Sequence, residues 1–239
     1  MPAPNRHFIN LDGEFDLPIY RIFSLDRVEE ILRDKKLMLV KPELWEDPFE
    51  NFLAKVPVEL TRSGGTCTVG DLFKDFFGQF WTQEQESDAM WRIYSPKKLG
   101  VRLKTTPRRL IEAIYDPANQ FRDNAYFIGK VHYFAEAQIA AFFQDGDFTR
   151  QVTMGLGWGQ AHALLIKRTE FEHEREVRLL FNDLRENSRG RATALVFAFA
   201  IDPETLFDEI TLDPRLELNA ANALWVRLKA LGFRHSPPE

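Results

Sequence analysis

The apolar and polar positions along the chain follow two different periods, which predict both strands and helices. Apolar residues at every second position, as in Gly100–Thr105, have the period of a half-buried strand. Apolar residues at three- and four-residue spacing have the period of a helix with one buried face. The predicted strands are Ile19–Phe23, Leu37–Val40, Gly100–Thr105, Phe127–Phe134, Glu176–Asn182, Leu195–Ile201 and Ile210–Leu212.

Capping residues and prolines predict where the helices begin and end. Thr106 is suited to cap a helix whose first position is proline, and Ser95, which precedes a proline, is suited to end one. The predicted helices run from Ser24 or Asp26 to about Lys36, over Asp88–Tyr94, onward from Pro107, over Glu136–Gln144 and over Leu218–Leu231, while Asp71–Phe80 is predicted to be a helix that runs into a strand.

Strands and helices are interspersed without the regular alternation of a doubly wound fold. This order predicts an α+β fold with a mixed sheet flanked by helices, in a single domain that spans residues 1–239. Residues 1–17 are expected to form a peripheral N-terminal extension, and residues 234–239 a peripheral tail. We expect the glycine-containing stretch 61–70 to be a surface loop. The nearly continuous apolar run Leu195–Ile201 predicts a strand buried on both faces.

Composition narrows the class of protein. The chain has 239 residues, 44% of them apolar and 28% charged, which excludes a disordered chain. No apolar stretch reaches the roughly 20 residues needed to cross a bilayer, so no membrane partner is expected.

The single cysteine, Cys67, cannot form an internal disulfide, and residues 1–17 lack the apolar core of a secretion signal, so we expect a cytoplasmic protein. The net charge of −5 argues against a broadly basic surface for nucleic acid.

The first of three polar segments that are candidates for the working surface is Trp45–Asn51. Proline at position 48 keeps Asp47 out of a regular helix, so Asp47 is expected in a turn. There its carboxylate would cap a helix that starts at Pro48 or, together with Glu50, would face a ligand. The pattern leaves both interpretations open.

The second segment, Ser87–Ser95, carries a tryptophan and a tyrosine. Trp91 and Tyr94 are three residues apart and therefore lie close together on a helix. Each combines a flat apolar ring with a hydrogen-bonding tip, which suits both to stacking against a nucleobase or a nicotinamide ring. Alternatively, the short helix covers the end of the core.

The third segment, Glu172–Arg178, leads into a strand. If Glu176 opens this strand, Glu174 and Glu176 point to the same side, about 7 Å apart. Crowded carboxylates raise one another's pKa or hold a cation between them. The alternative is a surface ion-pair ladder with Arg175 and Arg178, which would contribute little stability.

Patterns typical of metal and phosphate sites are missing from the sequence. The five histidines show no paired spacing of metal ligands, so no metal site is predicted. The glycine-rich stretch 155–159 lacks the lysine of a phosphate-binding loop.

The order of short motifs along the chain resembles a large bacterial family, the domain of unknown function DUF2971. The motifs are Tyr20-Arg21-x-Phe23, Leu37-x-Leu39, Asp47-Pro48-Phe49-Glu50, Met90-Trp91-x-x-Tyr94, Gly100-Val101, Val131-x-Tyr133, Lys167, Glu174-x-Glu176-x-Arg178, and a closing helix with Gly232 and Ser236. The resemblance covers nearly the whole chain. It implies no activity, because the family has none established.

A more distant resemblance connects the same residues with ADP-ribosyltransferases, and it implies a related fold with NAD as substrate. These enzymes place an arginine or histidine on the first strand, an aromatic or serine-bearing segment against nicotinamide, and a late glutamate, often in a Glu/Gln-x-Glu motif. The resemblance implies that Arg21 binds the NAD phosphates and that Tyr94 and Trp91 stack near the nicotinamide. Glu176 or Glu174 would stabilise the oxocarbenium ion that forms as nicotinamide leaves. The implied site is Glu176, Glu174 and Arg21 for catalysis, with Arg21, Tyr94, Trp91, Asp47 and Glu50 for the nucleotide.

Two other functions stay open at this point, as does the acceptor, which would be a protein or a nucleic acid. A non-catalytic module would bind a nucleotide or a protein partner through the same acidic and aromatic surface. A metal-dependent nuclease would use Asp47, Glu50, Glu174 and Glu176. Such carboxylate clusters usually include a lysine within the strand, where this chain has Arg178, and this disfavours the nuclease.

Overall fold

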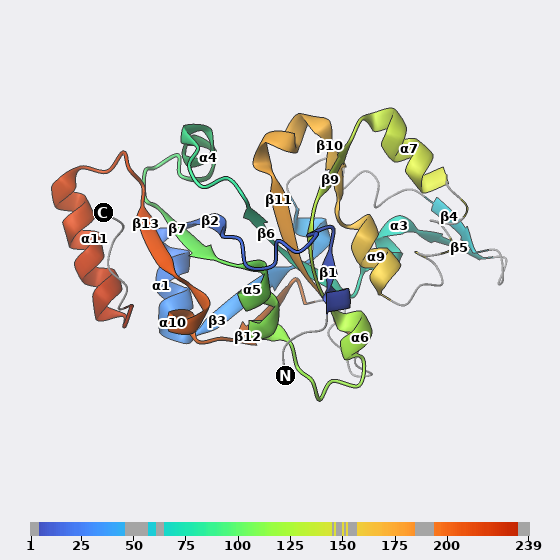
Figure 1. Ribbon diagram of the computed structural model, residues 1–239, viewed down its shortest axis with the longest axis horizontal. Coiled ribbons are helices and arrows are strands. Elements are labelled where there is room, and N and C mark those ends of the chain that lie inside the picture. Colours follow the sequence, from blue (N-terminus) through green and yellow to red (C-terminus); the bar gives the residue numbers. More distant parts are fainter. Residues whose placement is uncertain are drawn as a thin grey trace.

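A mixed sheet runs through the middle of the molecule, with helices on both sides of it (Figure 1). The computed structural model describes residues 5–45, 57–60, 65–144, 146, 150, 152, 157–184 and 194–233. Two strand pairs are parallel and the other pairs are antiparallel. The α+β class with a mixed sheet, predicted from the sequence, is confirmed.

The main sheet has nine strands in the described part of the chain. Along its path lie β1 (Phe8–Ile9), β8 (Tyr126–Lys130), β11 (Glu176–Asn182), β6 (Phe76–Thr82), β2 (Ile19–Ser24), β7 (Gly100–Thr105) and β13 (Glu209–Leu212). β3 (Lys36–Val40) branches from β6 and carries β12 (Val196–Ala200). Two small sheets pair β9 (His132–Phe134) with β10 (Ile166–Arg168), and β4 (Pro57–Leu60) with β5 (Gly65–Thr68).

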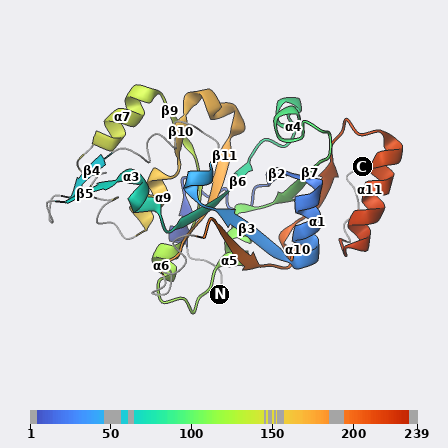
Figure 2. The ribbon, with the colours of Figure 1, turned by 180° about the vertical axis from the view of Figure 1, so that it is seen from behind.

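Helices surround this sheet. Three of them begin directly after a capping residue. Ser24, Ser87 and Thr106 each accept a hydrogen bond from the backbone N–H three residues later. The α-helices are α1 (Leu25–Asp34), α3 (Val69–Phe73), α4 (Asp88–Tyr94), α5 (Pro107–Ile114), α6 (Arg122–Ala125), α7 (Glu136–Gln144), α9 (Trp158–Ala163), α10 (Pro203–Leu206) and α11 (Leu218–Ala230), and the 3-10 helices are η1 (Asn5–His7), η2 (Pro42–Leu44) and η3 (Thr169–Glu174). Both views place α11 at one end of the molecule and the β4–β5 hairpin at the other (Figure 1, Figure 2).

The main sheet forks between β2 and β6. These strands share one residue pair, Tyr20 opposite Thr82, whereas β2 pairs with β7 over its full length and β6 does so with β11. Arg21 follows directly after Tyr20, and Glu176 lies opposite Thr82 on the other side of β6. The junction therefore brings Arg21 and Glu176, which are far apart in the sequence, to the two strands that flank this end of β6.

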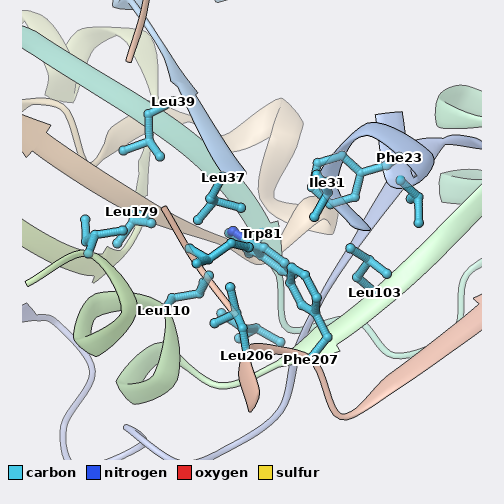
Figure 3. Close-up of a cluster of buried hydrophobic side chains, with 14 of the residues drawn as sticks. Phe23, Ile31, Leu37, Leu39, Trp81, Leu103, Leu110, Leu179, Leu206 and Phe207 are labelled. Atoms are coloured by element: carbon cyan, nitrogen blue, oxygen red, sulfur yellow. The ribbon is translucent and has the colours of Figure 1, made fainter. Parts of the chain in front are cut away.

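Trp81 lies at the centre of the larger hydrophobic cluster (Figure 3). Its ring centroid is 6.0 Å from that of Phe23 and 6.4 Å from that of Phe207, and its Nε1 donates to Gln79 Oε1 at 3.0 Å. A second cluster, which includes Trp45 and Phe76, covers the opposite face of β6. Alternate side chains of β6 therefore pack into two different hydrophobic clusters, one on each face of the strand.

Two segments differ from the sequence-based expectation. The prediction that Leu195–Ile201 is buried on both faces is wrong, because β12 pairs with β3 alone and its residues alternate between exposed and half-buried. Phe197 and Phe199 pack on the core, while small apolar residues face outward. The stretch 65–68, expected in a loop, is strand β5, whose end caps α3 through Thr68.

The N-terminal segment contributes to the core. Residues 1–17 were expected at the periphery, yet β1 pairs in parallel with β8, and His7, Ile9 and Leu11 are buried. The domain boundaries themselves stay a prediction, and residues 234–239 lie outside the described part of the chain. Among the described helices, none combines the length and apolarity required to span a membrane.

Replacing Trp81 with alanine tests the central position of this ring. We expect the free energy of unfolding in urea to fall by about 3–5 kcal/mol, because a large buried side chain leaves a cavity. Val226, on α11, is 69% exposed, and its replacement with alanine is the control, with an expected change within about 0.5 kcal/mol. Equal effects of the two substitutions would contradict the assigned core.

Candidate active site

Two carboxylates meet at the start of β11. η3 ends at Glu174 and β11 begins at Glu176, with Arg175 between them in the left-handed conformation at a φ of 41°. Lys167 Nζ, from β10, lies 2.6 Å from Glu174 Oε2 and 3.3 Å from Glu176 Oε2. The carboxylates therefore point to the same side, as predicted, and a cation lies between them.

Glu176 forms a buried ion pair with Arg178. Arg178 Nε is 3.2 Å from Glu176 Oε1 and its second terminal nitrogen is 3.0 Å from Glu176 Oε2. The guanidinium also donates to the Leu164 carbonyl at 2.7 Å and lies over the rings of Trp45 and Phe80. Glu176 is 4% exposed and Arg178 is 1% exposed, so the alternative of a surface ion-pair ladder is wrong for this pair.

The ionisation of the cluster follows from its charges. Burial alone would raise the pKa of Glu176, but the charges of Arg178 and Lys167 outweigh burial and lower this pKa. Burial alone would lower the pKa of Lys167, but the charge of Glu176 and contact with Glu174 raise it. Glu176 and Lys167 are thus both charged near neutral pH.

Tyr94 reaches this cluster from α4. Its hydroxyl donates to Glu174 Oε1 at 3.3 Å, while 43% of the residue stays exposed. Burial of the hydroxyl and the nearby charges of Glu174 and Glu176 raise the pKa of Tyr94 above its usual value. Tyr94 is therefore a neutral hydrogen-bond donor.

A polar clamp formed by Ser95, Asp213 and Arg215 holds the end of α4. Arg215 donates to the carbonyl oxygens of Trp91 and Ser95, at 2.9 and 2.7 Å, and forms an ion pair with Asp213 at 2.6 Å. Asp213 also accepts from the Ser95 hydroxyl at 2.5 Å. The clamp satisfies carbonyls at the C-terminal end of the helix and fixes the direction in which Tyr94 leaves it.

Arg21 lies on the β2 side of the fork. One terminal nitrogen of its guanidinium is buried and has no hydrogen-bond partner among the described residues. Burial lowers the pKa of Arg21 to about 10, while the carboxylate of Glu176, close enough to act through its charge, works in the opposite direction. A buried cationic donor without an acceptor is unfavourable, so an anionic ligand would be stabilised here.

The structure brings together Arg21, Tyr94, Glu174 and Glu176, whereas Trp91 lies apart from them. Trp91 is 1% exposed and its Nε1 donates to Glu86 Oε1 at 3.1 Å, so in this conformation its ring packs inside and offers no face to a ligand. This position matches the alternative in which α4 covers the end of the core. The predictions for Asp47 and Glu50 fall outside the described residues.

Sequence reasoning from the residue pattern missed two side chains that contact the glutamates, Lys167 and Tyr133. They are partners in the parallel β9–β10 pair, and the Tyr133 hydroxyl accepts from the backbone N–H of Glu176 at 2.8 Å. Both stand among the motifs of the DUF2971 resemblance, which was the available signal. Lys167 also supplies, from a neighbouring strand, the lysine whose absence from β11 disfavoured a nuclease. No group of three or more metal-ligating side chains is found within the described ranges.

Replacing Asp213 with asparagine tests the clamp and its pH dependence. Burial alone would raise the pKa of Asp213, but hydrogen bonds from Arg215 and Ser95 hold it below its usual value. The folded-state pKa is thus lower than the unfolded one, so the stabilisation is present above about pH 4 and is lost as the pH falls through the folded pKa. We expect Asp213→Asn to lower the Tm at pH 7 by roughly 5 °C, with a smaller difference at pH 3.

The control for this experiment is Asp88→Asn, which removes an exposed carboxylate from the same helix. Its ion pair with Arg92 is exposed to solvent and contributes at most about 1 kcal/mol. A Tm difference between wild type and Asp213→Asn that stays constant from pH 7 to pH 3 would contradict the assigned role.

Comparison with known proteins finds a family model that matches part of the chain, including part of this site. Residues 90–179 match the family model described as "Protein of unknown function (DUF2971)". No curated protein matches the sequence. Among solved structures, DarT of Thermus sp. 2.9 in complex with ADP-ribosylated ssDNA is similar, with 13% identity, coverage of 93% of this chain and 92% of that chain, and a TM-score of 0.40. DarT complexes with NAD+ and with carba-NAD+ are similar at 14% identity, 93% coverage of both chains and a TM-score of 0.39. The segment that carries Tyr94, Lys167, Glu174 and Glu176 is thus the part that matches DUF2971, which confirms the resemblance seen in the sequence.

Proposed function

We propose that the protein binds NAD at the β2–β6 fork and is an ADP-ribosyltransferase-like enzyme. The observation that carries the proposal is Arg21: one terminal nitrogen of its guanidinium is buried without a hydrogen-bond partner among the described residues, and the group lies within electrostatic reach of Glu176. A diphosphate supplies such an acceptor, because guanidinium groups bind phosphate oxygens through charge-assisted hydrogen bonds.

The charges of the described site favour an anionic ligand. Three cationic side chains, those of Arg21, Lys167 and Arg178, accompany two carboxylates, those of Glu174 and Glu176. Arg178 and Lys167 are engaged by the carboxylates, so Arg21 keeps its positive charge for a ligand. NAD combines a diphosphate with ribose hydroxyls that donate hydrogen bonds, and carboxylates accept such bonds.

The reaction would break the bond between the nicotinamide nitrogen and the ribose carbon. The nitrogen keeps the bonding electron pair, nicotinamide leaves as a neutral molecule, and positive charge develops on the ribose. A fixed carboxylate of Glu174 or Glu176 stabilises this charge without reorganisation. A nucleophile on the acceptor then forms the new bond to the ribose carbon and loses its proton. The acceptor, a protein or a nucleic acid, is open in this proposal.

One observation favours a second candidate, a nucleotide-binding module without turnover. Lys167 and Arg178 neutralise much of the charge of the two carboxylates, which reduces the field available to stabilise a cationic ribose. In that case NAD or another nucleotide would bind to Arg21 and stay intact.

NAD binding and nicotinamide release, measured on the same protein, test the proposal. We expect NAD to raise the Tm of the wild-type protein and nicotinamide to appear in the solution, quantified by chromatography. Replacing Arg21 with methionine is expected to weaken NAD binding by about 10-fold or more, the equivalent of one charge-assisted hydrogen-bonded contact. Arg33→Met is the matched control, because Arg33 is exposed on α1 and its loss should leave NAD affinity unchanged.

The possible results separate the candidates. Absence of NAD binding by the wild-type protein, or equal binding by Arg21→Met, would contradict the proposed site. Binding that depends on Arg21 but releases no nicotinamide would favour the binding module.

A further inference from the structure

We propose that Glu174 and Glu176 have different roles, in which Glu174 is the carboxylate that contacts the ligand and Glu176 is a positioning residue. The identity of the ligand rests on the proposed function, whereas the division of roles rests on the contacts of the two side chains. The Glu-x-Glu pattern alone does not distinguish them, since both residues point to the same side.

The hydrogen-bonding capacity of Glu176 is used within the protein. Arg178 engages both of its carboxylate oxygens, and Lys167 shares one of them. Its backbone N–H donates to the Tyr133 hydroxyl. Glu176 is also buried at the start of β11, where ladder pairing with β6 fixes the backbone. A ligand would have to break a buried ion pair to reach this carboxylate.

Glu174 is held more loosely. Its backbone carbonyl accepts from the Thr82 hydroxyl at 2.5 Å, which anchors the residue while leaving the carboxylate free of backbone bonds. The carboxylate contacts Lys167 through one oxygen and the Tyr94 hydroxyl through the other. The Tyr94 bond is long, at 3.3 Å, and comes from a partly exposed side chain, so a ligand hydroxyl can replace it at little cost.

Lys167 connects the two roles. Its ammonium group lies between the carboxylates and is itself almost buried, with 10% of its side chain exposed. Because Arg178 already compensates Glu176, the short contact from Lys167 to Glu174 mainly fixes the orientation of the ligand-facing carboxylate. Oε1 of Glu174 is left as the acceptor for a donor on the ligand, such as a ribose hydroxyl.

The experiment compares Glu174→Gln and Glu176→Gln, with Glu172→Gln as a control because Glu172 is exposed two residues earlier in η3. Three quantities are measured for each protein: the Tm without ligand, the kcat and KM of nicotinamide release, and the rate at which a water-soluble carbodiimide with an added amine labels each wild-type carboxylate. Fragment-ion mass spectrometry of a peptide that contains both residues assigns the labels to the individual glutamates.

We expect the Tm to fall by about 6 °C or more in Glu176→Gln, since this variant leaves the buried Arg178 charge uncompensated. Glu172→Gln should change the Tm by less than about 2 °C. Glu174→Gln should lower it by less than Glu176→Gln does, because Lys167 keeps Glu176 as its counter-charge. Nicotinamide release should lose about 100-fold in kcat in Glu174→Gln, a typical effect of removing one stabilising group. Glu176→Gln, assayed well below its own Tm, should stay within about 10-fold of wild type. Wild-type Glu174 should be labelled faster than Glu176.

Two kinds of result would overturn the division of roles. One is a Tm loss in Glu174→Gln as large as that in Glu176→Gln, or equal labelling of both carboxylates. The other is a folded Glu176→Gln protein that loses kcat by about 100-fold while Glu174→Gln retains it. If the wild-type protein neither binds NAD nor releases nicotinamide, the proposed function fails, and the Tm and labelling measurements still decide the roles of the two carboxylates.

Discussion

The buried guanidinium of Arg178 lies over the rings of Trp45 and Phe80 and depends on the Glu176 carboxylate, because an uncompensated charge in such a place costs several kcal/mol. This pair has consequences beyond β11. Arg178 also binds the Leu164 carbonyl, just before β10, and so fixes the segment from which Lys167 extends. The position of the lysine between the carboxylates therefore follows from the buried ion pair.

The site combines parts from both sides of a fork in the sheet. β2 contributes Arg21, and α4, held by the clamp after β13, contributes Tyr94. The opposite side contributes the carboxylates at the start of β11. A fork separates strands that a continuous sheet would pair. At this fork lie the polar side chains of Tyr94, Glu174 and Glu176, each with a defined partner. Among the described residues of the site, a buried nitrogen of Arg21 has no hydrogen-bond partner and can donate to a ligand.

Local sequence patterns predicted the elements whose ends carry their own signals. α4 spans Asp88–Tyr94 and ends before Ser95-Pro96 as predicted, and strict alternation placed β7 and β11 at their observed bounds. The pattern of Leu195–Ile201 was misleading, because an apolar run in an exposed edge strand cannot be distinguished by sequence from one in a central strand.

The candidate site was predictable only in part. The shared side of Glu174 and Glu176 follows from strand geometry, and the aromatic residues of α4 were visible. Which of the two rings is buried depends on contacts with distant elements, so Trp91 and Tyr94 could not be told apart. Arg215 contacts residues that are 120 and 124 positions away in the sequence, and no local sequence pattern predicts such a contact.

The position of β11 within the sheet also bears on what a family match can represent. Residues 90–179 end inside β11, which continues to Asn182, and β11 pairs along its whole length with β6, which precedes residue 90. Arg21 and Arg215 lie outside the same boundaries. Because β11 pairs with a strand outside the matched stretch, that stretch is not expected to be an autonomous folding unit. Folding of the strands on both sides of the fork is what brings Arg21 to the carboxylates of the matched stretch.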